Sequence, residues 1–108
     1  MDASANDHSS LEQALEQWRH TKYELQLYVC GMSPRSTDAI ANLTAVCDEH
    51  LAGRYTLQVI DLYAEPHRAK DEKLFAAPTL VRVQPLPVRR AVGDLSNTAR
   101  LLSVLELM

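Results

Sequence analysis

Hydrophobic and polar residues follow two different periods in the first half of the chain. The stretch YELQLYVC (23–30) alternates and is rich in β-forming residues, which predicts a strand. YTLQVIDL (55–62) is nearly continuously apolar, a pattern typical of a strand covered on both faces. Between them, apolar residues repeat with the spacing of a helix, at Ile40, Leu43, Val46, Cys47 and Leu51. Gly53 supplies the C-terminal stop of this predicted helix. A strand, a helix of about four turns and a second strand predict a βαβ unit with parallel strands and a right-handed crossover.

The second half of the chain predicts a short helix, a strand hairpin and a closing helix. Residues 64–76 carry mixed charges and contain Pro66, which suits the first turn of a short exposed helix. Residues 79–83 and 88–92 are predicted strands, and the prolines of the intervening QPLP favour a tight hairpin connection. For the last helix we expect Ser96 as the N-cap and one apolar side made of Leu101, Leu102, Leu105 and Met108.

A polar arm and a short amphipathic helix precede these elements. Residues 1–9 are polar, and Leu11, Leu15 and Trp18 then lie one helical face apart. We expect this helix to pack on the domain; the alternative is an element for partner binding or self-association. The predicted organisation is an arm with a helix at 1–20 and one domain at 21–108 with the order βαβαββα.

Composition and charge exclude several classes of protein. At 108 residues, 46% hydrophobic and 23% charged, the chain resembles an average soluble single domain. No apolar run reaches the roughly 18 to 20 residues that span a bilayer, and the acidic start lacks the features of a secretory signal. We therefore expect a cytoplasmic protein without membrane association. The net charge of −3 lies within residues 1–20, and a balanced remainder argues against nucleic-acid binding, although Arg82, Arg89 and Arg90 are candidates for a small local basic patch.

Motifs for metals, cofactors and catalysis are not found. Cys30 and Cys47 lack C-x-x-C spacing, and the four histidines form neither an H-x₃-H nor an H-E-x-x-H pair. The three glycines form no phosphate-binding loop. We expect no metal site, no cofactor and no catalytic residues.

A proline opens the third predicted strand. In the order βαβαββα this is the thioredoxin arrangement, in which the proline usually follows a cis peptide bond, so Ala77-Pro78 is the candidate. The redox motif of that fold belongs at the start of the long helix, where Ser33 and Ser36 stand instead of two thiols, and hydroxyls cannot perform thiol–disulfide exchange. Cys30, on the preceding strand, leaves a monothiol alternative, whereas Cys47 is expected in the core.

The chain resembles the KaiB family of circadian clock proteins. The resemblance runs from about Tyr23 to Leu105, through YELQLYVCGMSPRS, YTLQVIDL, EKLFAAPTLVRV and above all PLPVRRAVGDLSN. It implies a non-enzymatic protein that binds KaiC, a hexameric ATPase, and modulates its phosphorylation cycle. It also implies a fold-switching chain with two alternatives, a resting oligomer (dimer or tetramer) in a βαββααβ fold and a partner-binding monomer in the thioredoxin-like fold.

The resemblance also assigns residues. Lys73 stands where the family has a lysine important for docking on KaiC, and Arg89 and Arg90 match arginines associated with binding. Family members commonly carry glycine at the position of Val104 and aspartate at that of Glu106. Because glycine is the poorer helix former, Val104 favours a helix here and biases the chain towards the thioredoxin-like state.

Three functions follow as alternatives. The first is a regulatory binding protein for a KaiC-type ATPase, with a KaiA-like or a histidine-kinase partner left open. Asp38, where clock-type members have a basic residue, argues against contact with KaiA. The second is a thioredoxin-like monothiol redox protein or thiol sensor that uses Cys30. The third is a sensory domain like the KaiB-like input domain of the clock's output histidine kinase, which would require a kinase region on the same chain.

Overall fold

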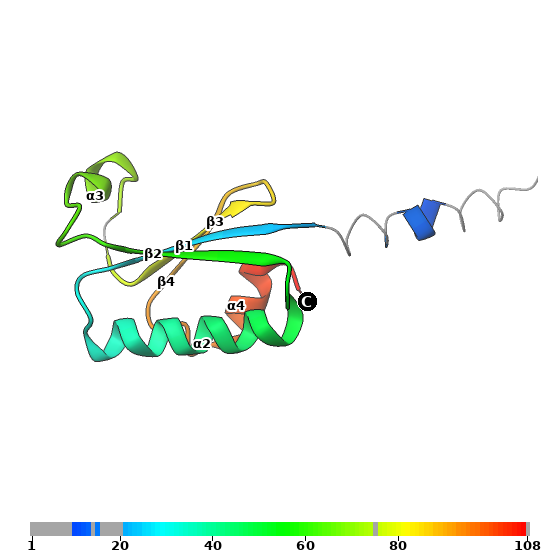
Figure 1. Cartoon of the computed structure of the whole chain (residues 1–108), viewed down its shortest axis with the longest axis horizontal. Coiled ribbons are helices and arrows are strands. Elements are labelled where there is room, and N and C mark those ends of the chain that lie inside the picture. The colour runs from blue at the N-terminus through cyan, green and yellow to red at the C-terminus, as the bar shows by residue number, and fades with distance from the viewer. Residues whose placement is uncertain (1–9, 14, 16–20, 75, 108) are drawn as a thin grey trace, which may run out of the picture.

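Four strands form one mixed sheet in the order β2-β1-β3-β4 (Figure 1). The computed structural model describes residues 10–13, 15, 21–74 and 76–107. Strand β1 (Tyr23–Val29) pairs in parallel with β2 (Tyr55–Asp61) and antiparallel with β3 (Thr79–Gln84), which pairs antiparallel with β4 (Arg89–Val92). The helices are α2 (Pro34–His50), α3 (His67–Asp71) and α4 (Thr98–Leu105). The predicted order βαβαββα, the parallel pair and the hairpin are confirmed.

Helices α2 and α4 cover one face of the sheet, as Figure 1 shows. Alternate residues of β1 point into this main core, where Leu25 and Leu27 meet Leu43 of α2 and Leu101 of α4, all at most 2% exposed. The other face carries a smaller cluster beneath α3, formed by Tyr28, Ile60, Leu62 and Val81. Helices α2 and α4 therefore cover most of one face of the sheet, whereas α3 covers only a part of the other.

Two sequence-based expectations about β2 and α4 are wrong. Strand β2 lies at the sheet edge, with Thr56, Gln58 and Val59 exposed, so its apolar run does not mark a strand covered on both faces. The N-cap of α4 is Asn97, whose side-chain oxygen accepts a hydrogen bond from the Arg100 amide. The Ser96 amide instead donates to Asp94 Oδ1 at 3.0 Å, in the turn before the helix.

The helix before the domain does not pack as expected at the positions that the structure describes. Residues 10–13 and 15 are helical, but Leu11 and Leu15 are 59% and 48% exposed. Trp18 and Met108, which belonged to the two predicted apolar faces, lie outside the described residues. No helix in the described part of the chain is long and apolar enough to cross a membrane.

Candidate functional site

The loop between β1 and α2 holds the two serines at the degenerate redox position. Ser33 is the N-cap of α2, and its Oγ accepts a hydrogen bond from the Ser36 amide at 3.2 Å. The Ser33 hydroxyl also donates to Ser36 Oγ at 3.0 Å, so the two side chains point at each other. Ser33 is exposed and Ser36 is buried. The two side chains therefore face each other as a redox pair would, but they are hydroxyls and cannot form a disulfide.

Neither cysteine is part of this pair. Cys30 is exposed and follows the last residue of β1 rather than belonging to the strand, and both cysteines are free thiols. Cys47 is fully buried on α2, as expected, and burial raises the pKa of its thiol to about 12. The Cys47 thiol is therefore protonated at neutral pH and carries no thiolate chemistry. The peptide bond Ala77-Pro78 has the cis conformation, as do Gln84-Pro85 and Leu86-Pro87.

Lys73 and Arg90 meet at a groove on the partly covered face of the sheet. The groove has a volume of about 310 Å³ and is lined by Lys73, Leu74, Ala76, Thr79, Arg90 and Val92. Arg90 Nη2 donates to the backbone oxygen of Glu72 at 2.8 Å, which holds the guanidinium beside the loop after α3. Lys73 has a positive φ of 54°, a conformation that non-glycine residues rarely adopt, and Val92 is 50% exposed. The result is an apolar floor with two cations at its rim.

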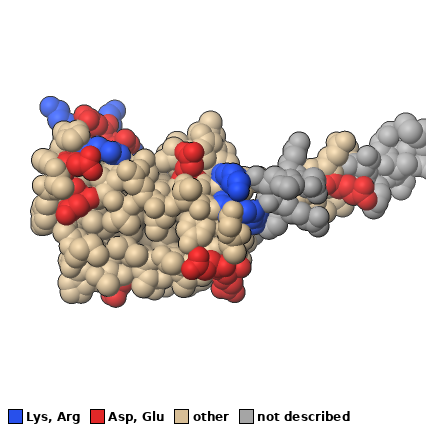
Figure 2. All heavy atoms as spheres, viewed as in Figure 1, with Lys and Arg blue, Asp and Glu red and all other residues tan. Residues whose placement is uncertain are grey.

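Charged side chains of both signs gather around the α3 end of the molecule. Figure 2 shows lysine, arginine and acidic side chains side by side there, whereas the visible surface over α2 is mostly uncharged. No group of His, Cys, Asp and Glu that could hold a metal ion is found among the described residues. This part of the surface offers ionic and apolar contacts rather than a metal centre.

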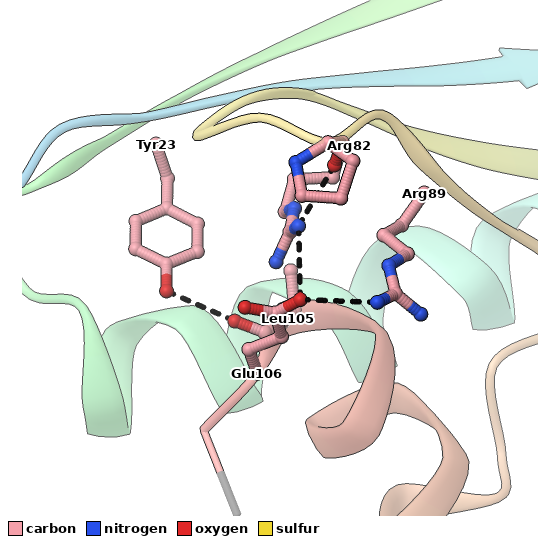
Figure 3. A network of polar contacts seen from close by, with 6 residues as sticks. Tyr23, Arg82, Arg89, Leu105 and Glu106 are labelled. Atoms are coloured by element: carbon pink, nitrogen blue, oxygen red, sulfur yellow. Dashed lines mark hydrogen bonds and ion pairs between the residues drawn. The ribbon is translucent and has the colours of Figure 1, made fainter.

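Arg89 lies on the opposite face of β4 from this groove. Its Nη2 is 3.4 Å from Glu106 Oε1, beyond the end of α4 (Figure 3). Arg82 is directly opposite Arg89 in the β3–β4 register and lies 3.3 Å from the same oxygen. Arg82 is completely buried and donates from Nη2 to the Pro87 carbonyl at 2.8 Å. The expectation that Arg82, Arg89 and Arg90 form one surface patch is therefore wrong.

Tyr23 completes the network at the end of α4. The buried Tyr23 hydroxyl donates to the Leu105 carbonyl at 2.9 Å, and burial is the main reason that the Tyr23 pKa is raised. Glu106 is the C-cap of α4 with a φ of 57°, and its amide donates to carbonyls of the last helical turn. Sequence reasoning did not find this network. The available signal was Arg82 itself, a charged residue inside an apolar strand, two residues after Leu80 on the same face.

The comparisons with known proteins agree on fold and family. The KaiB domain model matches residues 26–107. The circadian clock protein KaiB3 of Synechocystis sp. is 42% identical over 84 residues, covering 78% of this chain and 82% of the relative. The circadian clock oscillator protein KaiB of Thermosynechococcus vestitus is 43% identical over 86 residues, covering 80% of each chain.

Solved structures extend the likeness to the thioredoxin-like fold. The N-terminal domain of Synechococcus elongatus SasA has a TM-score of 0.66 at 22% identity, covering 82% of this chain and 87% of that domain. Mitochondrial thioredoxin 3 of Saccharomyces cerevisiae has a TM-score of 0.63 at 14% identity, covering 89% of each chain. The predicted thioredoxin-like fold is confirmed, and the resemblance found in the sequence is confirmed by the family match. The chain belongs to the KaiB family.

Proposed function

We propose that this chain is a non-catalytic regulatory protein that binds a KaiC-type hexameric ATPase and modulates its phosphorylation and ATPase cycle. Its relatives are circadian clock proteins, which makes a clock regulator the class of function. The finer statement, binding to a KaiC-type partner, comes from the family resemblance. The resting homodimer or homotetramer and the domain boundary between residues 20 and 21 stay predictions.

The observation that carries the proposal is the groove between the loop after α3 and β4. It brings together Lys73 and Arg90, two residues that the family resemblance assigns to binding and that lie on either side of β3 in the sequence. Apolar residues at the centre of an interface bury surface, and cations at its rim accelerate and orient the encounter with an acidic partner. A groove with exposed Val92 beside two cations has both features.

The degenerate loop supports the non-catalytic part of the proposal. Ser33 and Ser36 face each other at 3.0 Å, where a dithiol pair would be required for thiol–disulfide exchange. Cys47 is buried, so its thiol cannot reach a substrate. Cys30 is the exposed thiol of the described part of the chain, and it is not disulfide-bonded to a second cysteine there.

Charge reversal at Lys73 tests the proposal. Lys73→Glu replaces a cation at the groove rim with an anion, and we expect the affinity for a KaiC-type hexamer to fall at least about tenfold. Titration calorimetry or size-exclusion chromatography of the mixed proteins measures the loss.

Lys22→Glu is the matched control, because Lys22 is exposed, directly precedes β1 and undergoes the same change of charge. It should leave the affinity unchanged. Equal affinities for the wild type and Lys73→Glu would contradict the site, and a wild-type chain that binds no KaiC-type hexamer would contradict the function.

A further inference from the structure

Neighbouring arginines of β4 point to opposite faces of the sheet. Successive side chains of a strand alternate, so Arg89 faces α4 with Ala91, while Arg90 faces the groove with Val92. Arg90 is thus placed to touch a partner in the groove. Arg89 is 3.4 Å from Glu106 and does not line the groove.

The contacts of Arg89 explain why a carboxylate is needed on this face. Arg82 and Arg89 are cross-strand neighbours, and like charges directly opposite each other destabilise a sheet. Glu106 Oε1 lies between them, at 3.3 Å from Arg82 and 3.4 Å from Arg89, as Figure 3 shows. Arg82 is fully buried, and its Nε and Nη1 have no hydrogen-bond partner among the described residues. A buried guanidinium with so few partners depends strongly on the nearby negative charge.

The position of Glu106 joins this charge cluster to the end of α4. Glu106 is the left-handed C-cap of the helix, and the Tyr23 hydroxyl binds the preceding carbonyl, that of Leu105. The three ionic side chains therefore connect β3, β4 and the last turn of α4. We call Arg82, Arg89 and Glu106 the charge clasp.

We propose that Arg89 is a positioning residue for the docking groove. Through the charge clasp it fixes β4 against α4 on one face, and it thereby sets the place of Arg90 and Val92 on the other. This inference rests on the proposed function where it concerns partner affinity. It assigns different roles to the two adjacent arginines that the sequence grouped together.

Hydrogen exchange of the full chain without any partner tests the clasp itself. Arg89→Met and Glu106→Gln each break the ion pair between β4 and the end of α4, and Glu106→Gln also leaves the buried Arg82 without its counter-charge. We expect amides of β4 and of the last turn of α4 to exchange about twofold to fivefold faster in Arg89→Met, because that pair is half-exposed, and roughly tenfold faster in Glu106→Gln. Arg89→Lys keeps the cation and should restore most of the protection. The controls are Arg90→Met, whose side chain lies on the other face of β4, and Glu49→Gln, an exposed carboxylate at the end of α2; both should leave exchange in the last turn of α4 unchanged. Unchanged exchange in Arg89→Met and Glu106→Gln would overturn the inference.

A double-mutant cycle with a KaiC-type hexamer tests the positioning role. Arg89→Met and Glu106→Gln should both weaken binding, Glu106→Gln more strongly, and the double variant should bind no more weakly than Glu106→Gln alone, because both changes break the same ion pair. Arg90→Met should weaken binding without faster exchange in the last turn of α4, and its effect on binding should add to that of Glu106→Gln. Weaker binding of Arg89→Met with unchanged exchange would mean a direct contact and would overturn the positioning role. A wild-type chain that binds no hexamer would refute the proposed function. The exchange data would still test whether the charge clasp holds β4 against α4.

Discussion

Replacing Ser33 and Ser36 together with cysteine is expected to give a dithiol that oxidises to an intrachain disulfide. The two hydroxyl oxygens are 3.0 Å apart, and Ser33 caps α2, so the substituted thiols would face each other at a helix N-terminus. That position lowers the pKa of the exposed thiol and increases its thiolate fraction. We expect a reduction potential in the range of about −270 to −120 mV that C-x-x-C proteins cover.

The experiment uses a Cys30→Ser background, so that the exposed native thiol cannot compete. The double-cysteine variant is equilibrated with glutathione buffers, and the oxidised fraction is measured by alkylation and mass spectrometry. Ser36→Cys alone is the control and should form no intrachain bond. A dithiol that stays reduced, or that forms only intermolecular bonds, would show that the loop lacks the redox geometry and that more than the hydroxyls separates this chain from a thioredoxin.

The sequence predicted the element order well, because the two periods of its apolar residues are strong and its breakers are well placed. The period of 3.6 ran from Ile40 to Leu51 without conflict, and α2 ends at His50, close to the stop expected at Gly53. Ser33 and Ser36 were found because the topology fixes where a redox motif belongs, and a spacing of three residues is local information. Predictions of this kind are confirmed by the structure because they depend only on residues that are close together in the sequence.

The errors arose where the answer depended on distant segments. An apolar run does not reveal whether a strand lies in the centre or at the edge of a sheet. Strand β2 was therefore expected to be covered on both faces, but it lies at the edge. Likewise, the sequence predicts Arg82 to be a surface cation. The register of β3 and β4 instead places it opposite Arg89 and beneath the end of α4. Its counter-charge, Glu106, is 24 residues away along the chain. No sequence periodicity relates two residues so far apart. They come together only when α4 packs against the β3–β4 hairpin.

Stability of the folded chain is expected to fall steeply above pH 9, because of the buried thiol of Cys47. Burial raises the pKa of Cys47 from its usual value of 9.0 to about 12. The folded state therefore keeps a proton that the unfolded state releases. The stabilisation is fully present below pH 9 and is lost as the pH rises towards 12. A pKa difference of about three corresponds to a loss of about 4 kcal/mol, at ~1.4 kcal/mol for each pH unit.

Urea unfolding of the Cys30→Ser chain, followed by circular dichroism between pH 8 and 11, measures about two thirds of this loss. Cys47→Ala in the same background is the matched variant, since it removes the titrating group and keeps a small apolar side chain in the core. Burial also raises the pKa of Tyr23, so the unfolding free energy also falls as the pH rises through the titration of this residue. This fall begins only near pH 10, because the usual pKa of tyrosine is 10.0. The window from about pH 9 to 10 thus isolates Cys47. A fall in the unfolding free energy that is equally steep in both proteins across that window would contradict the assignment. A slope confined to the chain with Cys47 would establish that its core excludes a thiolate.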